Sequence, residues 1–149
     1  SGQFYTDLLS RSFMSKTNFE NLRVYVLSED LADLIWEIAS KWPHFDRDTV
    51  GKQIVRSADS IGANISEGTG RYGIQDNKRF AYIARGSLNE TKHWLRRAYK
   101  RNLLSENEVT RLKPILDELS PKLNAYIKSI KAVGEKQQRT TNDDQPTNL

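Results

Sequence analysis

The chain of 149 residues contains no cysteine, which excludes disulfides, thiolate nucleophiles and zinc sites built on cysteine. Its only histidines are His44 and His93. Carboxylate metal sites in helical bundles take a Glu-x-x-His pair from each of two helices, and Glu90 with His93 is a single such match. We therefore predict no metal site and no cofactor.

Long apolar runs are also missing, and none approaches the roughly 18 residues that a membrane-spanning helix needs. Hydrophobic residues make up 37% of the chain and charged residues 28%. Such a composition predicts a water-soluble cytoplasmic protein without a membrane partner. A chain of this length is typical of one domain.

Strand-like alternation and glycine-rich phosphate loops are absent, whereas apolar residues recur every three or four positions in four segments. The predicted helices cover residues 18–41, 46 or 48 to 67, 74 or 76 to 102, and 106–133. Because the connections are short, consecutive helices should be antiparallel neighbours. The fold prediction is an all-α, antiparallel up-down-up-down four-helix bundle, in a single domain over residues 18–133.

Several residues mark the expected helix ends. Trp42-Pro43 should stop the first helix, and Asp46 or Asp48 should cap the second after a loop at residues 44–46. Gly68-Thr69-Gly70 should end the second helix, with a glycine in the left-handed conformation. Ser105 and Glu108 have the spacing of a capping box at the start of the fourth.

Outside these helices we expect little structure. Residues 1–17 form an N-terminal extension or a remnant of tag removal, and Met14 is a possible natural start. After Gly134 the chain is almost wholly polar, which predicts a disordered tail over residues 134–149. Within the fourth helix, Pro114 and Pro121 each remove a backbone donor, so a kink or a break is expected there.

Small and polar residues interrupt the second and third helices and predict contacts between helices. Glycine costs about 1 kcal/mol relative to alanine inside a helix, so close approach of the two backbones is the expected reason for Gly62 and Gly86, with Ala63 and Ser87 beside them. The third helix should bury Phe80 and Ile83 among other apolar residues. The residues assigned to assembly or structure are Ser60, Gly62, Asn64, Glu67, Gly68, Gly86, Ser87 and Glu90.

An enzymatic site finds little support in these residues. Ser60, Asn64, Glu67 and Arg71 fall on one helix face, where they form either a polar site or a hydrogen-bond network that fixes helix register. Ser60 has no histidine nearby in sequence to activate it as a nucleophile. We predict no catalytic residue and no enzymatic activity.

Charge is unevenly distributed along the chain. Acidic residues exceed basic ones by three between residues 20 and 41, whereas basic residues exceed acidic ones by six between residues 74 and 101. The bases of the third helix recur every seven or four residues, which makes a positive stripe able to follow phosphates. The predicted nucleic-acid-binding residues are Arg56, Arg71, Lys78, Arg79, Arg85, Lys92, Arg96, Arg97, Lys100 and Arg101. The alternative is a solvated face, or a surface that docks an acidic helix of another subunit.

Three sequence stretches resemble a known family. They are the head at residues 18–25, the run from Gln53 to Gly68 that contains Asn-Ile-Ser-Glu-Gly, and residues 83–90 with Ala-Arg-Gly-Ser. These are similar to the four-helix bundle proteins encoded in intervening sequences of bacterial large-subunit ribosomal RNA genes. The likeness covers about residues 18–130. The family also includes the accessory variability determinant proteins of diversity-generating retroelements.

The resemblance implies a homopentameric barrel with a positively charged surface or pore. In the retroelement branch it implies binding to a reverse transcriptase and its RNA template during mutagenic cDNA synthesis. The function expected here is therefore a non-enzymatic, homo-oligomeric bundle that binds RNA or an RNA/DNA hybrid. The alternative is a scaffold protein of the ribosomal type that contacts only other proteins.

Overall fold

The computed structural model describes residues 19–143, so the expected N-terminal extension lies outside the described residues. All regular secondary structure within that range is helical. Four long helices form a bundle, as the sequence predicts. They are α2 (Phe19–Ser40), α4 (Lys52–Thr69), α5 (Ile74–Lys100) and α6 (Glu106–Asp143).

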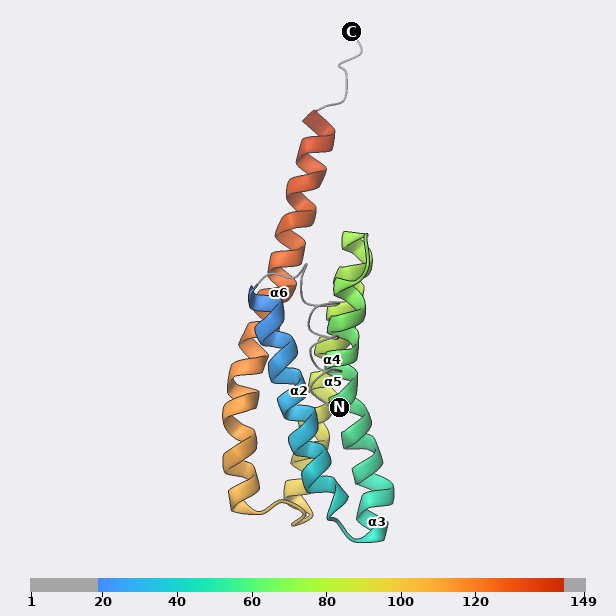
Figure 1. The fold of residues 1–149 in the computed structure, drawn as a ribbon, viewed down its shortest axis with the longest axis vertical. Coiled ribbons are helices and arrows are strands. Elements are labelled where there is room, and N and C mark those ends of the chain that lie inside the picture. The colour runs from blue at the N-terminus through green and yellow to red at the C-terminus, as the bar shows by residue number, and fades with distance from the viewer. Residues whose placement is uncertain (1–18, 144–149) are drawn as a thin grey trace, which may run out of the picture.

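The order of the helices around the bundle follows from their contacts. α4 packs against α2 and α5, and α6 packs against the same two helices. α2 and α5 therefore occupy opposite corners of the bundle. Figure 1 shows α2 and α4 joined at one end, α5 and α6 joined at that same end, and α4 joined to α5 at the other.

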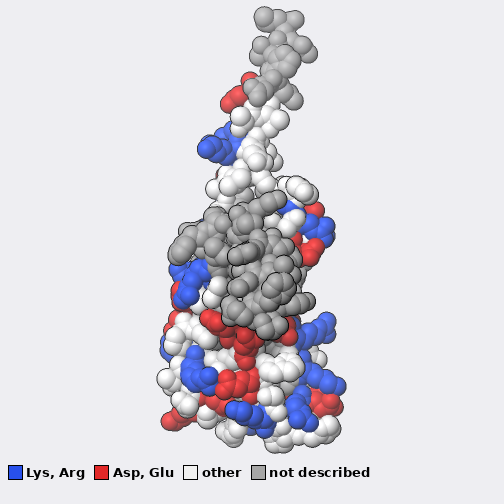
Figure 2. All heavy atoms as spheres, viewed as in Figure 1, with Lys and Arg blue, Asp and Glu red and all other residues white. Residues whose placement is uncertain are grey.

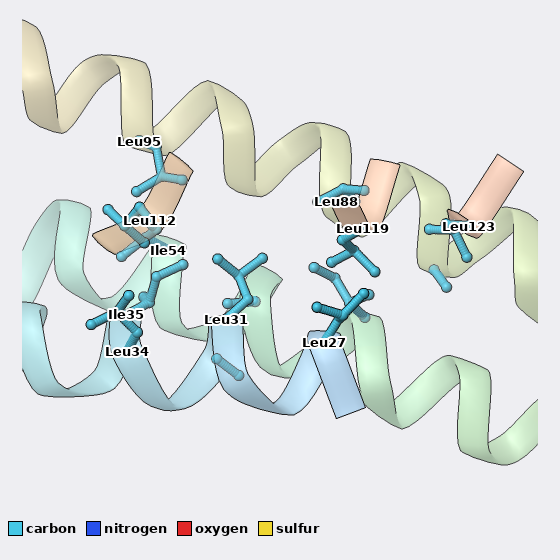
Figure 3. Packing of buried hydrophobic residues seen from close by; sticks show 14 of the residues in the cluster. Leu27, Leu31, Leu34, Ile35, Ile54, Leu88, Leu95, Leu112, Leu119 and Leu123 are labelled. Carbon is cyan, nitrogen blue, oxygen red and sulfur yellow. The ribbon is translucent and has the colours of Figure 1, made fainter. Parts of the chain in front are cut away.

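The core runs along the bundle axis and takes residues from all four helices. Leu31 of α2, Ile54 of α4, Leu88 of α5 and Leu119 of α6 are each at most 2% exposed. Figure 3 shows these side chains pointing into the space between the helices, with Leu88 and Leu119 together at one level and Ile54 at another, beside Ile35 and Leu112. Full burial of one such side chain contributes about 1.5–3 kcal/mol, so the apolar stripe of each helix accounts for the arrangement.

The start of the second helical segment differs from the prediction. Helix α3 (His44–Asp46) begins directly after Pro43, and a π-helical turn, η1 (Arg47–Gly51), leads into α4. No side-chain cap bond is present at Pro43 or at Asp46, so the predicted aspartate cap and the loop at residues 44–46 are wrong. Pro43 instead occupies the N-cap position, with φ −55° and ψ 156°, and its carbonyl accepts a hydrogen bond from the Arg47 amide (2.9 Å).

The residue with a left-handed backbone conformation is also not the one predicted. Gly70 at the end of α4 has φ −80°, and within residues 19–143 no glycine has a positive φ. Asn102, with φ 59°, takes that conformation after α5. The Asn102 amide donates to Tyr99 O (3.1 Å) and the Leu103 amide to Ala98 O (2.9 Å), which closes the helix as a Schellman motif.

The capping box of the last helix is confirmed. The Ser105 amide donates to Glu108 Oε1 (2.9 Å), and the Glu108 amide donates to Ser105 Oγ (3.1 Å).

In α5, two of the apolar residues expected in the core are not fully buried: Ile83 is 44% exposed and Phe80 is only partly buried. The buried face of that helix passes instead through Ala84 and Leu88.

The α6 helix continues without a break through Pro114 and Pro121, so the predicted break does not occur. Both prolines are exposed, as are Thr110 and Asp117, whose carbonyls lose their helical partner. Water can solvate these carbonyls. The helix also extends to Asp143 through part of the predicted tail, with residues 135–143 all exposed, and Figure 1 shows it projecting beyond the other helices.

Candidate nucleic-acid interface

The predicted basic stripe forms one continuous face on α5. Spacings of seven and four residues place its members on the same side of the helix. Lys92 donates a hydrogen bond to Ser120, and Arg85 donates to Asn124 Oδ1 (3.4 Å), so the stripe lies beside α6. We call it the α5 basic face, and its residues are Lys78, Tyr82, Arg85, Lys92, Arg96 and Lys100.

Most bases on α5 have no acidic partner. Eight lysines and arginines lie between residues 78 and 101, and within residues 19–143 only Arg79 forms an ion pair, with Asp76 at 3.9 Å. On neighbouring α6, Glu118 is engaged by α2: Arg23 donates two 2.7 Å bonds to Glu118 and thereby lowers the pKa of that carboxyl. The positive charge of α5 is therefore available to an external anion.

An aromatic ring lies within this charge. The Arg85 guanidinium is 5.0 Å from the centre of the Tyr82 ring, and the Lys131 ammonium is 5.2 Å from it. The nearby Lys131 ammonium, and then the charges of Lys78 and Arg85, lower the pKa of Tyr82 although partial burial opposes the shift. The phenol thus lies in a positive environment that favours anions.

Arg71, which precedes α5 in the chain, lies against Phe80 near the start of α5. The guanidinium groups of Arg71 and Arg79 each lie 5.1 Å from the centre of the Phe80 ring. Arg71 also donates to Glu67 Oε1 at 2.7 Å. The predicted Arg71 and Arg79 are therefore brought together near the start of α5, beside the α5 basic face.

Three other predicted binding residues lie apart from that face. Arg56 lines a cavity between α2 and α4 together with Trp36. Arg101 caps the end of α5, and Arg97 is partly buried, with its Nε atom lacking a hydrogen-bond partner. Seven of the ten predicted bases, counted with Arg71 and Arg79, thus gather on or next to one face.

Negative charge collects at the opposite corner of the bundle. Glu29, Asp30, Asp33 and Glu37 of α2 are all exposed. Figure 2 shows acidic side chains gathered near the middle of the face that α2 crosses. Burial, and then the nearby charge of Asp33, raise the pKa of Asp59 on α4. One molecule therefore carries an acidic and a basic side.

Of the polar residues predicted to fix register, Ser60 connects α4 to α5, and a second connection, between Thr91 and Ser57, was not predicted. Ser87 donates to Ser60 Oγ at 3.0 Å, and Thr91 donates to Ser57 Oγ at 2.9 Å. Asn64 instead donates to Ser60 O at 2.7 Å, within its own helix. The serine and threonine pairs set the register, whereas Asn64 acts locally.

Gly62 and Gly86 do not lie in the predicted close contact between α4 and α5. A Cβ at Gly62 would lie 2.9 Å from Ser28 Oγ of α2, so this residue faces the first helix and not α5. No atom of the part of the chain that the structure describes lies within 4 Å of a Cβ at Gly86. Close approach of α4 and α5 occurs at Gly68, against Asn77 and Phe80. Glu90 is exposed and accepts a 3.4 Å bond from Trp94.

Sequence reasoning missed the contribution of α6 to this face. Ser120, Asn124 and Lys131 lie 28, 39 and 49 residues after the α5 residues that they contact. No local spacing reveals such a pairing. The alternation of polar residues along α6 shows an exposed face but not which neighbour it borders.

Comparison with known proteins places this arrangement in a family. Residues 20–125 match the model of the family described as 23S rRNA-intervening sequence protein. The chain belongs to this family. The match covers α2, α4, α5 and about half of α6, and so includes the whole α5 basic face.

A solved structure agrees with this assignment. It is the crystal structure of a protein with unknown function from the S23 ribosomal protein family of Bacteroides thetaiotaomicron, 25% identical to this chain. The alignment covers 74% of this chain and 99% of that one, with a TM-score of 0.65. A search of the curated proteins found no match. Within residues 19–143, no helix is long and apolar enough to cross a membrane.

Proposed function

We propose that this 23S rRNA-intervening sequence family protein binds RNA, or an RNA/DNA hybrid, without catalysing a reaction. The observation that carries the proposal is the α5 basic face, whose bases form no ion pair within residues 19–143. From Lys78 to Lys100 the face is about 33 Å long, at about 1.5 Å per residue. Phosphate contacts of this kind position a nucleic acid without reading its sequence.

The proposal extends to assembly as a homopentameric barrel of antiparallel, up-down-up-down bundles. Support comes from the part of α5 beside the α5 basic face, because a contact made there leaves the bases to RNA, and head-to-tail contacts between copies can close into a ring. Gly86 and the 44% exposed Ile83 offer a flat surface for such a contact. Light scattering should give about five times the 17.2 kDa chain mass, and a monomer mass would refute the pentamer.

In the retroelement branch the RNA would be the template of a reverse transcriptase, with this protein as an accessory factor in mutagenic cDNA synthesis. The second candidate is a scaffold that binds protein alone. An apolar cavity of about 310 Å³ between α5 and α6, lined by Leu95, Tyr99 and Leu116, favours it. A reverse transcriptase gene beside this one would support the accessory role, and a surrounding ribosomal RNA gene the other branch.

Charge reversal tests the RNA interface. The test variant carries Arg85→Glu, Arg96→Glu and Lys100→Glu, which should weaken binding of a fluorescent RNA at low salt by at least about tenfold. A matched control carries Lys41→Glu, Lys122→Glu and Arg139→Glu, which are exposed residues of α6 and of the turn that follows α2. Both variants change the net charge equally.

Fluorescence anisotropy gives the affinity, and circular dichroism confirms that both variants keep their helices. Loss of binding in the α5 variant alone supports the proposal. Equal loss in both variants would show an effect of net charge without a defined face. Failure of the unmodified protein to bind RNA at low salt would overturn the proposed function and leave the scaffold candidate.

A further inference from the structure

A second cavity lies on the other side of the molecule from the α5 basic face. It is about 380 Å³ in volume and lies between the end of α2 and the start of α4, within the size range of ligand sites. Its walls are largely apolar, and the Trp36 indole, 62% exposed, forms part of them. We call it the Trp36 cavity.

Basic residues surround this aromatic wall. Arg47, Lys52 and Arg56 line the cavity, and among residues 19–143 no acidic side chain does. Lys52 is paired with Asp48 at 2.7 Å, whereas Arg47 and Arg56 form no ion pair within residues 19–143. An exposed indole beside two uncompensated guanidinium groups is the combination that holds a base by stacking and a phosphate by charge.

Local backbone structure creates the arrangement. The π-helical turn η1 widens the chain between Arg47 and Gly51, and turns of this kind are frequent at functional sites. Gly51 is buried and lines the cavity, and a Cβ at this position would lie 3.6 Å from the Trp42 ring. The turn also brings Arg47 alongside Lys52 and Arg56 of α4.

We propose that the Trp36 cavity binds one unpaired nucleotide of a single-stranded RNA, with its base stacked on Trp36 and its phosphate held by Arg47 and Arg56. This inference rests on the RNA-binding function proposed above and deepens it, because it specifies a single-stranded ligand. Duplex RNA cannot place a paired base on the indole.

Acidic residues limit the path of the strand. Asp33 lies one turn before Trp36 on the same side of α2, and Asp59 lies one turn after Arg56 on α4. Burial, and then the charge of nearby Asp33, raise the pKa of Asp59. These carboxylates repel phosphates at that side of the cavity. The strand therefore leaves past Arg47, and the site holds one nucleotide and not a long tract.

The test compares Trp36→Leu with Tyr72→Leu, a matched loss of an exposed aromatic residue outside both surfaces. Probes are a fluorescent single-stranded oligoadenylate of about 12 nucleotides and an RNA duplex of the same length. Trp36→Leu should weaken single-strand binding by about 5- to 150-fold, as expected for one lost stacking contact. Duplex binding should be unchanged, and Trp36→Phe should restore most of the loss.

A second variant, Arg47→Gln with Arg56→Gln, should lower the salt dependence of single-strand binding by about one to two ions. Unchanged single-strand affinity in Trp36→Leu, while the α5 charge reversal still abolishes binding, would overturn the inference and leave the proposed function intact. A change in oligomeric mass in Trp36→Leu would show that a second copy occupies the cavity, which also overturns it. No RNA binding by the unmodified protein would overturn both proposals.

Discussion

Gly68→Ala tests the closest approach between α4 and α5. An added Cβ would lie 2.8 Å from Asn77 Oδ1 and 2.9 Å from Phe80 Cβ, both shorter than carbon contacts allow. Asn77 Oδ1 accepts a 3.1 Å bond from the Tyr126 hydroxyl, and Phe80 Cβ is fixed to the backbone of α5. Neither atom can move aside alone, so the two helices must separate.

The expected cost follows from these contacts. Overpacking of this kind costs about 1–3 kcal/mol, while alanine recovers up to about 1 kcal/mol of helix propensity. Gly68→Ala should therefore lower the free energy of unfolding by about 1–2 kcal/mol. Gly86→Ala is the matched control, because within residues 19–143 nothing lies within 4 Å of its Cβ, and it should raise that free energy by about 0.5–1 kcal/mol.

Urea unfolding followed by far-ultraviolet circular dichroism measures both variants against the unmodified protein. The melting temperature should fall by about 2–8 °C for Gly68→Ala and rise slightly for Gly86→Ala. Gly68→Ala as stable as the unmodified protein would refute the packing described between α4 and α5. A destabilised Gly86→Ala with reduced oligomeric mass would instead place a neighbouring copy against Gly86.

Two further predictions concern a buried threonine and an aspartate near another carboxylate. Thr91→Val should lower the free energy of unfolding by about 1 kcal/mol in urea titrations, because the fully buried hydroxyl loses its 2.9 Å bond to Ser57; an unchanged midpoint would contradict a role in register. The pKa of Asp59 is raised above 3.8 by burial and by Asp33, so the folded protein binds this proton more tightly than the unfolded chain. Stability should therefore fall as pH rises from about 3.8 through the raised pKa, and Asp59→Asn should remove this part of the pH dependence.

Much of the fold could be predicted from the sequence because the signals are local. The period of apolar residues gives the helices, and the serine and glutamate of the capping box lie only three residues apart. Pro43 ends the segment after α2 as predicted, but a proline does not show from sequence how soon the next helix begins. The polar composition after Gly134 predicts disorder, but a helix that is already formed and packed can continue outward into such a segment.

The candidate site could be predicted only in part. The bases of α5 follow from their spacing, but the neighbours that border them depend on tertiary packing. Lys131 and Asn124 meet Tyr82 and Arg85 across the α5–α6 contact, at separations that no local pattern encodes. The same reason explains why Gly62 faces α2 and why Arg56 lies in a different surface from the other bases.

Salt dependence of RNA affinity tests the central proposal most directly. If the five bases of the α5 basic face each neutralise a phosphate, the logarithm of the association constant should fall against that of salt concentration with a slope of about −3.5 for a single strand. The variant with Arg85→Glu, Arg96→Glu and Lys100→Glu should reduce this slope by more than half. A slope near zero, or one that this variant leaves unchanged, would contradict RNA binding through α5.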